Sequence, residues 1–159
     1  MMRQVPPGAD FSLTNLSAEP KERHEKLVDL FGQYIFWMRN WTNDSTQRLV
    51  ESPEAREQLS AILRELYEKT ARLAPEDRDR ALRLAESSVD AFIILLLRML
   101  AHRGVDFPLG KQHAVRYRLE MEIVEQETDE IAHEEVVNRD GKKHFADYWG
   151  RWLNRFREK

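Results

Sequence analysis

The spacing of apolar residues changes along this chain, and the change constrains the fold more than any other feature. Up to about residue 103, apolar residues recur every three or four positions, as in helices that bury one face. Between Val115 and Ile123 they alternate with charged residues, as in a half-buried strand. After Asp140 the helical spacing returns. The sequence therefore predicts a mainly helical α+β fold, in which a three-helix bundle precedes a β-hairpin and an aromatic-rich C-terminal helix.

The first helix is predicted to begin after Ser17, a good N-cap residue. Its expected core stripe consists of Leu27, Leu30, Phe31, Tyr34, Ile35, Met38 and Trp41. Residues 40–45 include Asn, Thr and Ser, whose side chains compete with helical hydrogen bonds. We therefore expect the helix to bend or break in that stretch.

Two further helices are predicted before residue 104. The pair Ser52-Pro53 suits a helix start, because proline lacks the N–H that would be unpaired at that position. The expected core stripe of this second helix is Leu59, Ile62, Leu63, Leu66, Thr70 and Leu73. The third helix is expected to run from Pro75 to about Arg103, and its second half is apolar nearly all round. That pattern favours a central helix covered on several sides.

A hairpin is predicted from a second extended segment, Ile131 to Val137, which follows a polar turn. Every register tried places at least one of His133, Glu134 and Glu135 opposite an apolar residue, so the register stays open. The last helix is expected to close the core with one stripe of large side chains. The stripe consists of Phe145, Tyr148, Trp149, Trp152, Leu153 and Phe156.

The length of 159 residues fits one domain, so we expect a flexible N-terminal arm over residues 1–17 and a single α+β domain over 18–159. The chain has no cysteine, which excludes a disulfide scaffold and a thiolate nucleophile and fits a cytoplasmic location. A net charge of −3 disfavours nucleic acid and anionic lipid as partners. The most apolar run, Val89 to Leu100, is too short to span a bilayer, so no membrane association is expected.

No catalytic motif is present, so the sequence favours a protein that is not an enzyme and needs no cofactor. Its five histidines are scattered over different elements, and no Gly-rich phosphate loop or nucleophile motif occurs. His133 and Glu135 are two apart and would share a strand face, but two ligands are too few for a metal site. We therefore predict no catalytic and no metal-binding residues.

Asp90 stands at the start of the apolar part of the third helix, where a carboxylate is costly unless it is paired. One interpretation is an internal ion pair with Arg39, Arg48 or Arg116. The other is a pocket carboxylate, which would make the chain a small enzyme or a ligand-binding domain. The sequence alone leaves both open.

The strongest candidate for a binding surface is the acidic segment from Glu120 to Glu135, which contains no Lys or Arg. Its partner-binding candidates are Glu120, Glu122, Glu134 and Glu135. Trp37 lies four residues before Trp41. Packing in the core and at its boundary is the favoured explanation of this pair, and an aromatic hot spot at Trp37 is the alternative. Mutual neutralisation with the basic residues after Asp140 is the competing explanation of the acidic segment. Nucleic-acid binding by that basic helix ranks last.

The segment Val89-Asp90-Ala91-Phe92-Ile93, with the apolar run to Leu100, the hairpin and the Trp-rich end, resembles small bacterial proteins of the toxin-immunity type. Residues 36–41 fit the first helix of that group. The resemblance implies a non-enzymatic inhibitor that blocks a toxin, and it transfers no functional residue. We expect the acidic surface to meet a toxin domain with a basic surface, such as a nuclease. The sequence leaves a homodimer open.

Overall fold

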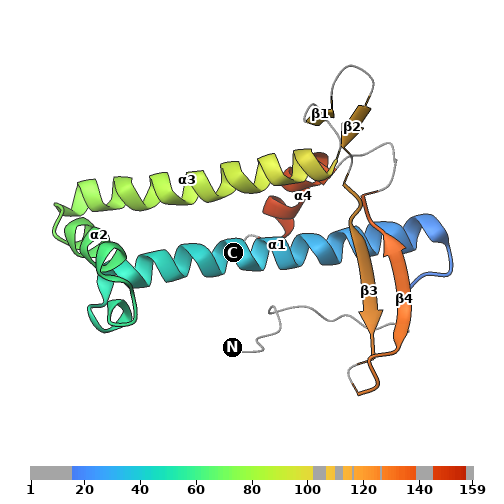
Figure 1. Cartoon of the computed structure of the whole chain (residues 1–159), viewed down its shortest axis with the longest axis horizontal. Coiled ribbons are helices and arrows are strands. Elements are labelled where there is room, and N and C mark those ends of the chain that lie inside the picture. Colours follow the sequence, from blue (N-terminus) through green and yellow to red (C-terminus); the bar gives the residue numbers. More distant parts are fainter. Residues whose placement is uncertain are drawn as a thin grey trace. The chain divides into compact units, whose positions relative to one another are not determined.

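The computed structural model describes residues 16–101, 107–109, 113–115, 117–125, 127–138 and 145–156 (Figure 1). The helices are α1 (Pro20–Glu51), the 3₁₀ turn η2 (Glu54–Arg56), α2 (Ala61–Ala71), α3 (Pro75–Leu100) and α4 (Phe145–Phe156). The strands are β1 (Phe107–Leu109), β2 (His113–Val115), β3 (Glu120–Val124) and β4 (Ile131–Val136). This confirms a mainly helical α+β protein. The expected arm of residues 1–17 and the turn at Asp140 fall largely or wholly outside the described residues.

The described residues form two compact units. Unit 1 comprises residues 16–36 and the described residues from 93 to 156, and unit 2 comprises residues 37–92. Helices α1 and α3 each contribute residues to both units. Unit 1 also holds the β-strands and α4, whereas unit 2 holds η2 and α2.

Helix α1 is continuous from Pro20 to Glu51, so the predicted break at residues 40–45 is wrong. The Thr42 hydroxyl donates to the carbonyl oxygen of Met38 at 2.8 Å, and the Thr46 hydroxyl donates to that of Thr42 at 2.9 Å. These bonds add a second donor to carbonyls inside the helix and do not replace the helical ladder. Local competition by these side chains therefore costs too little to end a helix of this length.

The second helix begins later than predicted. Ser52 and Pro53 start the 3₁₀ turn η2, where the Ser52 hydroxyl oxygen accepts the N–H of Ala55 at 3.2 Å. Helix α2 begins only at Ala61. Arg56, buried in η2, donates to the carbonyl oxygens of Leu49 and Val50 at 3.2 and 3.1 Å. These bonds occupy carbonyls that the end of α1 leaves without helical partners.

Strands β3 and β4 form the predicted antiparallel hairpin, drawn in orange in Figure 1. In its register Glu122 lies opposite Glu134, while Met121 and Ile123 lie opposite Glu135 and His133. Asp129 adopts a left-handed conformation (φ 56°) in the turn, which a short polar side chain tolerates. The strand predicted from Val115 onwards is interrupted. Val115 ends β2, which pairs with β1 in an antiparallel ladder that the sequence did not predict.

Asn138, just after β4, ties the hairpin to the end of α3. Its side-chain amide donates to the carbonyl oxygens of Leu100 and Tyr117, each at 2.8 Å. Its side-chain oxygen accepts the N–H of Leu119, also at 2.8 Å. One side chain thereby satisfies three backbone groups in an irregular stretch, which fixes where β3 starts.

The core of unit 1 is aromatic, and α4 supplies most of it, as predicted. Trp152 is fully buried, and its ring lies 5.8 Å from that of Tyr148 and 6.2 Å from that of Phe31. Gly32 of α1 lies directly beneath Trp152, because a Cβ atom at Gly32 would overlap the indole. The buried hydrophobic residues of this unit are Leu27, Val28, Phe36, Ile93, Leu97, Ala101, Val137, Phe145, Tyr148, Trp149 and Trp152.

Unit 2 is built differently. Val50 is the only buried hydrophobic side chain among its residues 37–92, all of which the structure describes. Its exposed large apolar side chains are Met38, Trp41, Ile62, Leu63, Leu66, Leu73, Leu84 and Phe92. The predicted core stripe of α2 is therefore wrong, as are the positions of Met38 and Trp41 in the stripe of α1. The expectation that α3 is covered on several sides is also wrong, because Phe92 and Leu95 in its apolar second half are 67% and 57% exposed.

Candidate functional site

One face of the β3–β4 hairpin carries three exposed carboxylates, Glu120, Glu122 and Glu134, which we call the acidic face. Because Glu122 and Glu134 are cross-strand partners and Glu120 is two residues from Glu122, all three side chains leave the sheet on the same side. The sequence predicted these three residues as a binding surface, and the register brings them together.

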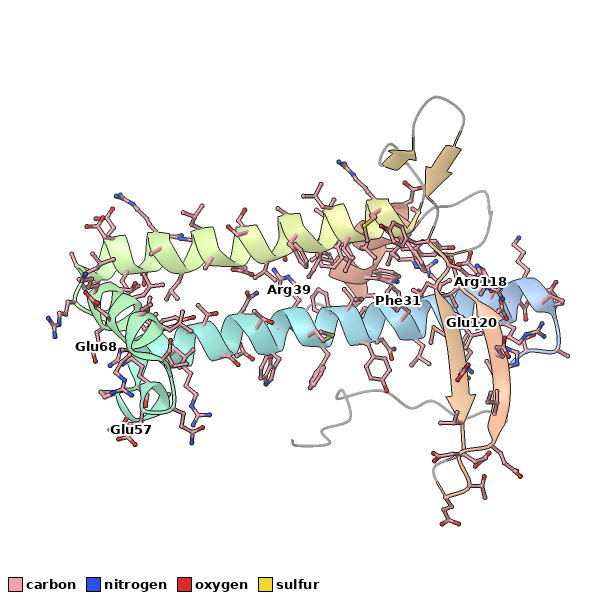
Figure 2. The ribbon with its side chains drawn as sticks, viewed as in Figure 1. Phe31, Arg39, Glu57, Glu68, Arg118 and Glu120 are labelled. Carbon is pink, nitrogen blue, oxygen red and sulfur yellow. The ribbon has the colours of Figure 1, made fainter. Side chains whose placement is uncertain are left out.

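The carboxylates of the acidic face interact with one another. Hydrogen bonding to Glu120 and repulsion from its charge raise the pKa of Glu134, and Glu122 adds to that repulsion. The same hydrogen bond lowers the pKa of Glu120, with help from Arg118, whose guanidinium lies 2.7 Å from the Glu120 carboxylate (Figure 2). Arg118 thus offsets part of the negative charge of the acidic face, and Glu122 and Glu134 have no ion-pair partner of their own in the described part of the fold.

Glu135 belongs to the other face of the hairpin and is buried, so it is not part of the acidic face. Its carboxylate lies 2.7 Å from Nδ1 of His24 and accepts a hydrogen bond from Arg23 at 3.4 Å. Nε2 of His133 lies 3.5 Å from the same carboxylate, without hydrogen-bond geometry. The expectation that Glu135 meets a partner is therefore replaced by a structural role, in which Glu135 joins the hairpin to α1.

A hollow of about 510 Å³ lies beside this cluster. It is lined by Arg23, Arg118, Glu120, His133, Glu134, Glu135 and Val136. The lining mixes both charges and offers no hydroxyl, thiol or amine that an imidazole could activate as a nucleophile. Among the described residues, no group of three metal-ligating side chains lies close enough to hold an ion.

Asp90 is ion-paired within unit 2, and its partner is Arg39 of the three arginines considered. The Arg39 guanidinium donates to both carboxylate oxygens of Asp90 and, at 2.7 Å, to Glu86 (Figure 2). The hydrogen bond to Asp90 raises the pKa of Arg39 in spite of burial. A cavity of about 100 Å³ is lined by Glu86 and by further residues of α1 and α3, among them Asn43 and Thr46, but not by Asp90. Arg116 lies outside the residues whose side chains are described.

Trp37, the predicted hot-spot residue, is half-buried in unit 2, whereas Trp41 is 60% exposed. The sequence assigned these two tryptophans the other way round, with Trp41 in the core stripe and Trp37 at its flank. The acidic face belongs to unit 1, so the structure gives no support for a single surface containing Trp37 and the three carboxylates.

The basic residues of α4 pair with α1 and not with the acidic hairpin. Arg151 contacts the carboxylates of Glu25 and Asp29, and Arg155 contacts Asp29. The Tyr148 hydroxyl donates to Glu25 at 2.8 Å, and burial together with this hydrogen bond raises the pKa of Tyr148. Arg151 and Arg155 are thus engaged with α1. The competing explanation, neutralisation of the acidic segment by the basic residues after Asp140, therefore does not hold for these two arginines, and the other basic residues there lie outside the described part of the chain.

Comparisons of this chain with family models, with curated proteins and with solved structures found no match. No activity or partner is therefore inferred from a relative. Among the described residues, none of the helices combines the length and apolarity needed to cross a membrane.

Proposed function

We propose that this chain is a non-enzymatic protein-binding module whose acidic face docks a basic surface of another protein. The observation that supports this most is the direct cross-strand pairing of Glu122 with Glu134, two exposed carboxylates of the same sign. Like charges placed opposite each other destabilise a hairpin. A basic partner removes that repulsion and gains electrostatic complementarity, which speeds association and selects the partner.

The partner is a toxin domain with a basic active surface, such as a nuclease, and the chain acts as an immunity-type inhibitor that covers this surface. Support comes from the resemblance of the sequence to proteins of that type and from the sign of the acidic face. A nuclease surface is basic because it binds phosphates, so an acidic inhibitor competes with the nucleic acid for the same side chains. The interpretation of Asp90 as a pocket group loses its support, because Arg39 binds both oxygens of the Asp90 carboxylate.

The test is co-expression of the chain with the products of the genes that flank its own, scored by growth of the host and by direct binding. The informative variant is Glu122→Lys combined with Glu134→Lys. Neither glutamate forms an ion pair within the described residues, so the fold should lose little. Protection of the host should be lost, and association should slow at low salt, because attraction becomes repulsion.

The matched control is Glu57→Lys combined with Asp79→Lys, which makes the same change in net charge at exposed residues of unit 2. This control should protect the host as the unchanged chain does. The proposal fails if neither flanking product binds the chain. It also fails if the hairpin variant and the control protect equally, because then net charge, and not the acidic face, governs recognition.

A further inference from the structure

Polar side chains of α1 and α3 meet within unit 2. Arg39 of α1 binds Glu86 and Asp90 of α3, and the Asn40 side chain accepts a further hydrogen bond from Arg39 at 3.1 Å. The small cavity beside them is lined from α1 by Asn43, Thr46 and Gln47. Arg39 is thus hydrogen-bonded to Glu86 and Asp90 across the two helices. Thr46 and Gln47 instead donate hydrogen bonds within α1.

Many large apolar side chains of unit 2 are instead exposed to solvent. Its eight exposed large apolar residues, from Met38 to Phe92, are each between 42% and 81% exposed. Helix α2 shows this most clearly, because none of its residues is buried and Ile62 is 81% exposed. Ile62, Leu63 and Leu66 are neighbours on one face of α2 and are 81%, 45% and 56% exposed. A contiguous exposed apolar face of this kind marks a surface at which another molecule binds.

The charges beside the apolar residues of α2 indicate what that molecule is. Ile62, Leu63 and Leu66 share one face of α2, and Glu65 and Lys69 flank that face at helical spacing. Both charged side chains are exposed, and they lie 2.6 Å apart. A partner surface that carries only positive or only negative charge cannot complement both Glu65 and Lys69, which form the charged rim of this apolar face. Two copies of α2 packed antiparallel about a two-fold axis match this rim twice, because Lys69 of each copy lies beside Glu65 of the other.

The other candidates fit less well. The charged residues within α2 are Arg64, Glu65, Glu68 and Lys69, which balance, whereas a helix that binds anionic lipid has a polar face rich in Lys and Arg. A strongly basic partner suits the acidic face of unit 1 and not this rim. We therefore propose that unit 2 is a dimerisation surface, on which α2 packs against α2 of a second copy of the chain.

The first test is the oligomeric state of the full chain at about 100 μM, where a dimer with a dissociation constant of about 1 μM is almost fully formed. Light scattering after size exclusion should show a dimer. Ile62→Glu combined with Leu66→Glu should give a monomer with unchanged helical content, because both side chains are exposed in the single chain. Val124→Glu combined with Ile131→Glu, which places the same two charges at exposed apolar residues of the hairpin, is the control and should remain dimeric.

The second test uses the charges. Glu65→Lys should weaken the dimer at least tenfold, because two basic pairs then face each other across the axis. Adding Lys69→Glu to it should restore the dimer, because the pairs are complementary again in reversed order. A monomeric unchanged chain at this concentration overturns the proposal and leaves another protein or a lipid surface as the occupant. A dimer that survives Ile62→Glu with Leu66→Glu, or a charge reversal without rescue, also overturns it.

This inference is independent of the proposed function. The dimer variants lie in unit 2 and the acidic-face variants in unit 1. An acidic-face variant that loses host protection but stays dimeric therefore bears only on the proposed function. A dimer variant that becomes monomeric but still protects the host bears only on the dimerisation surface.

Discussion

The two units of this protein distribute apolar and polar side chains in opposite ways. Unit 1 buries Trp149 and Trp152 and exposes the carboxylates of the hairpin, whereas unit 2 places Arg39 and Asp90 between its helices and exposes Trp41. Each unit contains amphipathic helices, so amphipathicity does not decide which side faces inward. What decides it is the presence of a second apolar surface to pack against, and within unit 1 the short aromatic helix α4 provides one.

The largest expected difference in stability between the two units is that between a tryptophan variant of unit 1 and one of unit 2. Trp152→Ala in unit 1 should lower the free energy of unfolding by about 3–5 kcal/mol, because it removes a fully buried indole that contacts three other rings. Trp41→Ala in unit 2 should change it by only about 0.5 kcal/mol in dilute protein, because that side chain is exposed. Urea denaturation measures both. Equal losses would show that Trp41 is covered in solution and would remove the contrast between the units.

The sequence predicted unit 1 better than unit 2, and the reason is physical. The stripe of α4 identifies a buried face correctly, because aromatic side chains of that size leave few other ways to fold. The alternation in β3 correctly separates its half-buried residues, Met121 and Ile123, from the exposed glutamates. The stripe of α2 has the same spacing, but spacing reports only that a helix has an apolar face and not that this chain covers it. Asn138 joins the hairpin to the end of α3 by hydrogen bonds to backbone groups. The sequence could not predict this role, because only the fold brings those backbone groups together.

Of the four glutamates predicted for the binding surface, three lie on the exposed face of the hairpin and one does not. Glu120, Glu122 and Glu134 form one exposed face, as strand alternation implies once the register is known. Glu135 is one residue further along and points to the other side, where Arg23 and His24 bind it. No count of acidic residues could separate Glu134 from Glu135, because the difference lies in a helix more than 100 residues earlier in the chain.

A smaller effect is predicted for the ion pair that replaces an apolar contact in unit 2. Asp90→Asn should lower the free energy of unfolding by about 1–3 kcal/mol, because the largely buried Arg39 guanidinium loses a charged acceptor. The control is Glu76→Gln, which removes an exposed pair with Arg80 and should cost less than about 1 kcal/mol. Urea denaturation followed by helical circular dichroism measures both. An unchanged stability of Asp90→Asn would show that polar contacts do not hold unit 2 together.

The smallest effect concerns the exposed side of unit 1. Glu134 has a raised pKa because its protonated form donates a hydrogen bond to Glu120, so the stability gained from that bond is lost as the pH rises through the pKa of Glu134. Glu134→Gln keeps a donor at every pH and removes one charge. The variant should melt slightly above the unchanged chain at pH 7, and the difference should shrink at about pH 4, where glutamates become protonated.

Thermal melts at the two pH values measure this difference, with Glu57→Gln in unit 2 as the control that should show none. A lower melting temperature of Glu134→Gln at pH 7 would contradict the interpretation, because it would mean that the ionised Glu134 stabilises the fold. The acidic face would then be part of what holds unit 1 together, as its aromatic core is. A slightly higher melting temperature of Glu134→Gln instead means that unit 1 tolerates repulsion between carboxylates on its surface, because the aromatic core around Trp152 supplies the stability. The acidic face is then not needed for folding, so its charges can serve the binding of a partner.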